Sequence, residues 1–193
     1  MKDLCFERIP SDGEFAVERA CHHLLHGSII VYPTDTIYGF GCDSKNEGAI
    51  RSLNLIKGRK GPLSVLSPST SIATEWMDID NIKKNKAKSM LGGRTTIICP
   101  VKSNIVSSMI LGIESSLGIR VPDHKFCNSL SKEYNNPIIT TSVNLSGVKP
   151  ISNPDEIEKK FGKNISLLID EGEINGTSSE IYFLSNGEWE KLR

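Results

Sequence analysis

The chain has 193 residues, of which 38% are hydrophobic and 24% are charged. This length and composition predict a globular protein with a sizeable core, and we expect a single domain over residues 1–193. The 23 basic and 23 acidic residues cancel, which argues against a protein that coats nucleic acid by net charge, so any polyanion site must be a local patch.

The first half of the chain predicts a helix, a buried strand and a polar loop in succession. Apolar residues recur at helical spacing over Phe15–Leu25, and Gly27 is the expected C-cap. The β-branched run Ser28–Tyr32 predicts a buried strand, and the Gly-punctuated stretch 34–41 predicts a loop. The other elements expected in this half are a helix over 47–57 and a strand over 63–66.

The second half contains mostly strands. We expect strands over 95–99, 117–121, 138–142, 166–170 and 180–184, and a short helix over 154–161. Lysines crowd the stretch 81–88, for which a solvated surface segment is favoured over a contact with RNA phosphates. Because strands and helices intermix irregularly along the chain, the predicted fold class is α/β with a mixed sheet rather than a purely parallel one.

Cysteine, histidine and hydropathy patterns exclude several classes of protein. The five cysteines are scattered without a C-x-x-C pair, so we expect small buried side chains rather than disulfides or a zinc site. His22, His23 and His26 form no H-E-x-x-H motif, so surface or half-buried histidines are favoured over metal ligands. The polar N-terminus and the short apolar runs predict a cytoplasmic protein without membrane contact.

Three polar segments carry the chemistry, and none of them is a common nucleotide-binding fingerprint. Hydroxyls at Thr34 and Thr36 follow a strand end, where α/β proteins place ligands, although a turn satisfied by its own side chains is the alternative. Lys57 and Arg59 are suited to a phosphate or carboxylate, but in isolation they are better explained by the helix dipole. The stretch 140–147 offers hydroxyls and an amide for a neutral polar ligand, or for an Asx/ST turn.

Taken together and in this order, these segments resemble one family. The stretches YPTDTIYGFG (32–41), KGR (57–59), RVPDH (120–124) and TSVNLSG (141–147) are similar to the motifs of the YrdC/Sua5/TsaC family of threonylcarbamoyl-AMP synthases. The resemblance runs from about Gly27 to the C-terminus. It implies a YrdC-like twisted mixed sheet with surrounding helices and one large concave cavity for L-threonine and ATP, with Mg²⁺.

The resemblance also implies the reaction. Members of the family join L-threonine, bicarbonate and ATP into L-threonylcarbamoyladenylate and release pyrophosphate, and a tRNA threonylcarbamoyltransferase complex uses the product to form t6A at adenosine 37. One alternative is a module that binds double-stranded RNA or tRNA, against which the zero net charge and the lack of aromatic stacking motifs argue. The other is a relative that handles a carbamoyl adenylate in hydrogenase maturation, for which 193 residues are too few.

Expected site residues follow from the family motifs. The implied contacts to threonine are Thr36, Arg120 for its carboxylate, Thr141 and Ser179. Lys57 and Arg59 are expected to face the triphosphate and to act in catalysis. The other implied contacts to ATP are Ser116, Ser142, Val143, Asn144, Ser152 and Arg193. No protein ligand to a metal is implied.

This sequence departs from the family pattern in several places. The usual K-x-R-P-x-x-x-P-L is shortened to residues 57–63, with Gly61 replacing a side chain that often contacts ATP. A histidine contact that commonly follows falls near Leu66 or Ser67, and the E-S-T segment is degraded at 178–182. Because the sequence ends at Arg193, we expect the short form without a C-terminal Sua5 domain.

Overall fold

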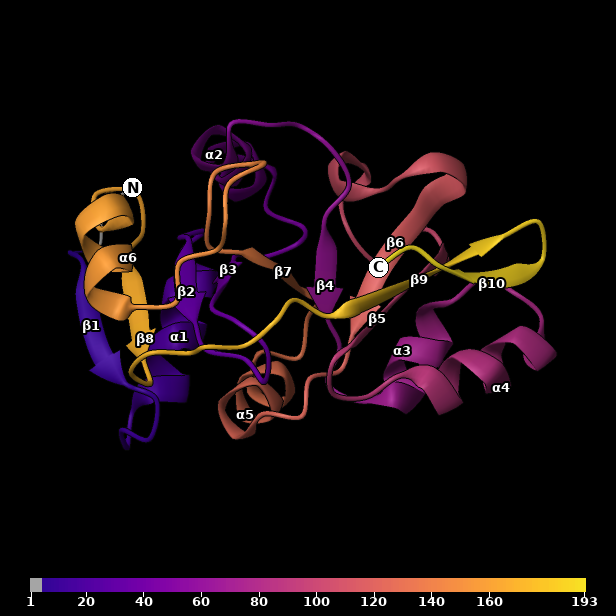
Figure 1. Cartoon of the computed structure of the whole chain (residues 1–193), viewed down its shortest axis with the longest axis horizontal. Helices are drawn as coiled ribbons and strands as arrows, with labels where there is room; N and C mark the ends of the chain where they lie inside the picture. Colours follow the sequence, from indigo (N-terminus) through magenta and orange to yellow (C-terminus); the bar gives the residue numbers. More distant parts are fainter. Residues whose placement is uncertain (1–4) are drawn as a thin grey trace.

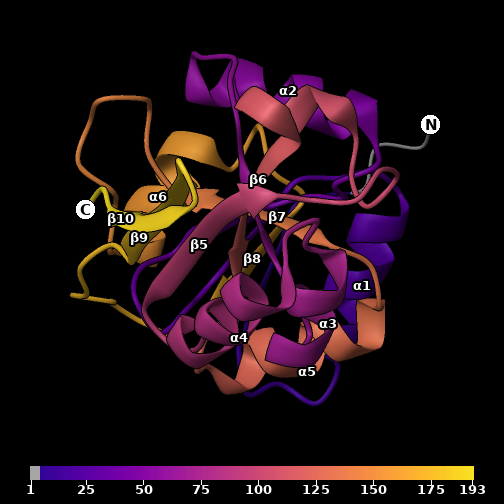
Figure 2. The same ribbon diagram turned by 90° about the vertical axis from the view of Figure 1, so that its right-hand side faces the viewer.

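The computed structural model describes residues 5–193, and within them ten strands form one twisted mixed sheet (Figures 1 and 2). Their order across the sheet is β1-β8-β2-β3-β7-β4-β6-β5-β9-β10. The strands are β1 (Glu7–Pro10), β2 (Ile30–Tyr32), β3 (Gly39–Gly41), β4 (Ser64–Leu66), β5 (Thr95–Pro100), β6 (Ser116–Arg120), β7 (Ile138–Ser142), β8 (Leu167–Asp170), β9 (Glu180–Ser185) and β10 (Glu188–Lys191). Parallel and antiparallel pairs both occur, which confirms the predicted mixed sheet.

Helices cover both faces of this sheet. They are α1 (Ala16–Leu25), α2 (Glu47–Lys57), α3 (Thr70–Trp76), α4 (Asn81–Met90), α5 (Lys125–Tyr134) and α6 (Pro154–Phe161), with short 3-10 turns at η1 (Ser108–Ile110) and η2 (Ile113–Ser115). Side chains of a strand alternate between its two faces, so Ile30 and Tyr32 of β2 pack with α1 and α5, whereas Val31 packs with α2 and α6. The central strands are therefore buried on both sides.

Helices α2 and α6 and strand β7 have the predicted bounds, and the other predicted elements agree to within a few residues. Gly27 follows the end of α1 with a φ of 73°, as expected of a residue at a helix C-terminus. Elements β1, α3, α5 and β10 were not predicted, and the lysine-rich surface stretch 81–88 lies within α4. The edge strands β1 and β10 are short and largely polar, so neither carries a clear alternation of its own.

The predicted loop 34–41 was wrong in its second half, where Gly39–Gly41 forms the buried strand β3. A Cβ on Gly41 would lie 2.6 Å from Cε1 of Tyr32, so glycine lets β3 pair closely beside β2. Phe40 supplies the core contact, and its ring centroid lies 5.1 Å from that of Phe161. Glycine has a low intrinsic strand propensity, which is why this strand is hidden in the sequence.

The prediction of surface or half-buried histidines was wrong for His23, which is fully buried in α1. Its Nδ1 lies 2.8 Å from Oγ of Ser166, and its Nε2 lies 3.3 Å from Oε1 of Glu7. A buried imidazole is tolerated here because both ring nitrogens have polar partners. His22 is half-buried and His26 is exposed, as expected. Within residues 5–193, no helix has the length and hydropathy needed to cross a membrane.

Candidate active site

The PTDT segment forms a turn between β2 and β3 that is held by Thr34. Its Oγ1 accepts hydrogen bonds from the backbone N–H groups of Thr36 (3.1 Å) and Ile37 (3.2 Å) and donates to the carbonyl oxygen of Ile37 (2.7 Å). The two threonine Oγ1 atoms lie 2.9 Å apart. For Thr34, the alternative of a turn satisfied by its own side chains is therefore correct. Thr36 is positioned by that turn.

A cavity of about 210 Å³ lies beside this turn. Its lining consists mainly of residues with hydroxyl side chains, together with three arginines. The residues that line it are Thr34, Thr36, Ile37, Tyr38, Gly39, Arg59, Pro62, Leu63, Ser64, Thr96, Arg120, Thr140, Thr141, Ser142, Ser178, Ser179, Ile181 and Arg193. Segments far apart in the sequence meet here because β3, β7, β4, β6, β5 and β9 are consecutive neighbours in the sheet.

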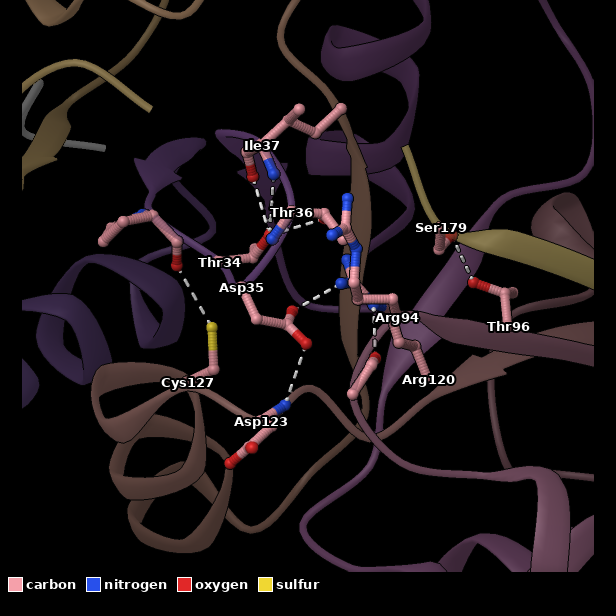
Figure 3. Close-up of polar contacts among 12 residues, drawn as sticks. Thr34, Asp35, Thr36, Ile37, Arg94, Thr96, Arg120, Asp123, Cys127 and Ser179 are labelled. Atoms are coloured by element: carbon pink, nitrogen blue, oxygen red, sulfur yellow. Dashed lines mark hydrogen bonds and ion pairs between the residues drawn. The ribbon is translucent and has the colours of Figure 1, made fainter. Parts of the chain in front are cut away.

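Seven of the residues expected from the family motifs line this cavity: Thr36, Arg59, Arg120, Thr141, Ser142, Ser179 and Arg193. Arg120 ends β6, and its register partner on β5 is Thr96. The hydroxyl of Thr96 lies 2.8 Å from that of Ser179, so a buried pair of hydroxyls stands close to the arginine (Figure 3). Nε of Arg193 donates to the backbone oxygen of Ser179 (3.1 Å).

Arg120 is almost fully buried and is paired with an acid of the fold. Its Nη2 lies 2.5 Å from Oδ1 of Asp35, and its Nε donates to the carbonyl oxygen of Gly93 (3.4 Å) (Figure 3). A guanidinium has five N–H groups, and these two bonds use two of them. Arg120 can therefore hold its structural partner and still present donors to a bound anion.

The expectation that Lys57 is an exposed charge at a helix end was wrong. Its side chain is buried, with 2% of the residue exposed, and its Nζ donates to the carbonyl oxygen of Ser142 (2.6 Å) and to Oδ1 of Asn144 (3.0 Å). Burial, and then repulsion by Arg59, lowers the pKa of the Lys57 ammonium to about 8. The helix turns Lys57 inward because it shares the apolar face of Ile50 and Leu53. Arg59, beyond the end of the helix, is exposed.

Five expected site residues do not line the cavity: Lys57, Ser116, Val143, Asn144 and Ser152. Val143 is a core residue. Asn144 is buried, and its amide nitrogen donates to the carbonyl oxygens of Leu145 and Val148. Ser116 is buried at the start of β6. Ser152 lies in a neighbouring groove that shares Ile37 and Ser178 with the cavity. Of these residues, Lys57 and Asn144 lie behind the lining, since both are bonded to Ser142.

The sequence analysis missed Asp35, Tyr38 and Thr96. Asp35 lies inside a recognised motif, but its partner Arg120 is 85 residues away, so the motif was the one available signal. The hydroxyl of Tyr38 donates to the carbonyl oxygen of Gly172 (2.8 Å) and accepts from the N–H of Glu171 (2.9 Å), which only the tertiary structure reveals. Thr96 is indistinguishable from other strand threonines in the sequence.

Comparisons with known proteins show the family of this chain. A family model for the Sua5/YciO/YrdC domain, described as telomere recombination, matches residues 22–193. The chain belongs to the Sua5/YciO/YrdC family. It is 32% identical over 173 residues to a threonylcarbamoyl-AMP synthase of Serratia proteamaculans, covering 85% of this chain and 89% of that one. A synthase of Photorhabdus laumondii is 29% identical, with 90% and 94% covered.

Solved structures of the family superpose closely on this chain. Sua5 of P. abyssi in complex with L-threonine matches with a TM-score of 0.85 and 25% identity, covering 97% of this chain and 56% of that longer chain. YciO of E. coli matches with a TM-score of 0.85 over 100% of this chain and 95% of its own, and its 22% identity supports the shared fold. The expected YrdC-like mixed sheet with surrounding helices is thereby confirmed.

Proposed function

We propose that this chain is a threonylcarbamoyl-AMP synthase, which joins L-threonine, bicarbonate and ATP and releases pyrophosphate. The observation that carries the proposal is the cavity where Arg120 lies among the hydroxyls of Thr36, Thr141 and Ser179. Relatives that bear the synthase name support the proposal, because this chain matches most of the length of each of them. An arginine surrounded by neutral hydroxyls suits a small amino acid with a carboxylate and a hydroxyl.

We assign this cavity to threonine rather than to the whole nucleotide because of its size. At about 210 Å³ it is smaller than the roughly 300–1,000 Å³ typical of sites that enclose drug-sized ligands. We assign the carboxylate of threonine to Arg120, and its amine and hydroxyl to Thr36, Thr141 and Ser179. ATP would extend outward from the cavity past Arg59 and Arg193, which line its edge.

Arg59 and Lys57 are assigned to the phosphates. Arg59 can grip them directly, since it is exposed and borders the cavity. Nζ of Lys57 is bonded to Ser142 and Asn144, so its positive charge would act on the phosphates from behind the residues that line the cavity. A direct contact with a phosphate would require Lys57 to break one of these two hydrogen bonds. Ser116, Val143 and Ser152 are further expected contacts of ATP, but they do not line the cavity, so the nucleotide would have to reach them beyond it.

Mg²⁺ fits this site only as an ion carried by ATP. Within residues 5–193, no cluster of three or more His, Cys, Asp or Glu side chains could hold a metal, and no Asp or Glu side chain lines the cavity. Mg²⁺ bound to nucleotides usually keeps several waters and is held largely by phosphate oxygens. When bound, it would neutralise charge on the triphosphate. The hydroxyls and arginines of the chain supply the remaining contacts.

The chemistry requires positioning and charge neutralisation. The neutral amine of threonine combines with bicarbonate, losing water, to form N-carboxythreonine. One carboxylate oxygen of that group then attacks the α-phosphorus of ATP, the bond to the β-phosphate oxygen breaks, and pyrophosphate leaves. Arginines that are already in place stabilise the charge on the phosphates without reorganising. The product would pass to a tRNA threonylcarbamoyltransferase complex, and any contact with RNA would be local because the net charge is zero.

The deciding experiment measures pyrophosphate release by the pure protein with ATP, bicarbonate and isotopically labelled threonine, with mass spectrometry of the adenylate. We expect release only when both threonine and bicarbonate are present. Serine and valine, each lacking one side-chain group of threonine, are the matched substrate controls. Equal ATP hydrolysis with and without threonine would refute the assignment.

A further inference from the structure

We propose that Asp35 is a positioning residue that sets the direction of the Arg120 guanidinium toward the carboxylate of the amino-acid substrate. This inference rests on the proposed function. Asp35 is the third residue of the turn that presents Thr36, and Arg120 ends a strand 85 residues later in the sequence. Their side chains are 11% and 7% exposed, so the pair is shielded from solvent.

The guanidinium is held at two points. Oδ1 of Asp35 lies 2.5 Å from Nη2, and the carbonyl oxygen of Gly93 accepts from Nε at 3.4 Å (Figure 3). The longer bond to Gly93 is weak, so Asp35 is the main constraint on rotation of the plane. Two-point binding of a carboxylate by arginine requires that plane to face the ligand. Asp35 itself does not line the cavity in the described chain, so its effect on a ligand passes through Arg120.

Asp35 is itself anchored. Its Oδ2 accepts a hydrogen bond from the backbone N–H of Asp123 at 3.1 Å, three residues beyond Arg120. The carboxylate therefore joins the 34–37 turn to the end of β6 and the segment that follows it. This link fixes the separation between Thr36 and Arg120, which are assigned to opposite ends of the bound threonine. Movement of either segment without the other would separate the two contacts.

Charge adds a second reason for this arrangement. A buried guanidinium without an acid is costly, so the free protein needs a counter-ion for Arg120. The carboxylate of a bound substrate would balance the charge of Arg120 only while the substrate was present. Asp35 supplies that counter-ion and keeps the buried guanidinium oriented in the absence of substrate. Preorganised charge of this kind lowers the cost of binding.

The test compares Asp35→Asn with Asp123→Asn. Both remove one negative charge at the same corner, but the side chain of Asp123 is exposed and only its backbone N–H takes part in the link. We expect Asp35→Asn to raise the KM for threonine by about tenfold or more, because displacing a substrate-positioning group by about 1 Å can lower the reaction rate about a hundredfold. The affinity for ATP, measured by isothermal titration, should stay within about twofold of wild type. Asp123→Asn should resemble wild type in both.

A variant that keeps the charge covers the possibility that Asp35→Asn does not fold. Asp35→Glu retains the ion pair but adds a methylene group, so it should fold and should still raise the KM for threonine. Unchanged threonine KM in a folded Asp35→Asn or Asp35→Glu protein overturns the positioning role, as does an equal loss of ATP and threonine binding. Failure of wild-type protein to bind threonine would instead overturn the proposed function.

Discussion

At the scale of single residues, Lys57 and Arg59 form one cationic motif in the sequence but have different environments in the structure. Lys57 is buried and bonded to Ser142 and Asn144, whereas Arg59 is exposed at the edge of the cavity. Nζ of Lys57 also lies 5.9 Å from the ring centroid of Phe40. We therefore expect Lys57 to contribute to both folding and function, and Arg59 to contribute to function alone.

This contrast predicts different phenotypes for Lys57→Ala and Arg59→Ala. Both should lower the catalytic efficiency with ATP by at least about tenfold, since charge-assisted bonds are each worth about 1.5–3 kcal/mol. Lys57→Ala should also reduce the free energy of unfolding by about 1–3 kcal/mol, because it empties a buried position and removes two hydrogen bonds. Arg59→Ala should leave the melting temperature nearly unchanged. Denaturant melts and steady-state kinetics measure both; equal melting temperatures would refute the buried role of Lys57.

The lowered pKa of Lys57 predicts a pH dependence. Because its pKa falls from 10.5 to about 8 on folding, about half of the folded molecules have lost this positive charge at pH 8. Affinity for ATP should therefore weaken between about pH 7.5 and 9.5 in wild type and change little in Lys57→Ala, as titration calorimetry can measure. Between the two pKa values the unfolded chain binds more protons, so Lys57 makes the free energy of unfolding rise with pH. A parallel loss of ATP affinity in both proteins would contradict this.

At the scale of elements, the segment 171–179 between β8 and β9 passes the PTDT turn (Figure 1), and its last two residues line the cavity. The hydroxyl of Tyr38 bonds both Glu171 and Gly172, and Arg94 Nη2 donates to Oγ1 of Thr177 at 2.5 Å. Between these anchors, Gly176 lies directly on the backbone of Thr36. A Cβ there would fall 1.6 Å from the carbonyl oxygen of Thr36, so only glycine fits.

Gly176→Ala should therefore displace this segment from the turn. We expect overpacking to lower the free energy of unfolding by about 1–3 kcal/mol and to raise the KM for threonine, since Thr36 must move or lose its cover. The matched control is Gly172→Ala in the same segment, which has a φ of 73° but nothing within 4 Å of the added Cβ. That variant should lose stability from backbone strain while keeping its threonine KM. Similar KM values for both variants would mean that the segment does not position Thr36.

At the scale of the whole molecule, a partly buried polar cluster around the buried His23 joins β1 and α1 to the rest of the sheet. His23 of α1 contacts Ser166 just before β8 and Glu7 of β1, and Arg19 forms an ion pair with Glu7. Burial lowers the pKa of His23, although the nearby Glu7 acts in the opposite direction. The edge of the sheet is therefore stabilised by a histidine that is most favourable in its neutral form.

Acid should weaken this edge. The folded pKa of His23 lies below its ordinary value of 6.5, so the unfolded chain takes up a proton first as the pH falls through 6.5. We expect the melting temperature of wild type to fall more steeply between about pH 7 and 5.5 than that of His23→Gln, which can keep a polar contact but cannot titrate. His26→Gln removes an exposed histidine and should follow wild type. Identical pH profiles for wild type and His23→Gln would exclude this role.

The sequence by itself determined the features that depend on neighbouring residues. The period of apolar residues located α2 and α6, and the β-branched runs located β2 and β7. The polar motifs and their order were sufficient to indicate the family, because together they resemble the motifs of its known members. Helix α5 carried a comparable signal in Phe126, Leu130 and Tyr134, which the sequence analysis overlooked.

Only the tertiary structure decided which polar groups are buried and with what partners. Lys57 and His23 look like surface residues in the sequence, and their burial follows from the segments that the sheet order places beside them. The pairing of Asp35 with Arg120 joins residues 85 positions apart, and no local pattern encodes it. Propensity and periodicity describe short-range interactions, whereas the burial of a charge depends on long-range neighbours that supply its hydrogen bonds.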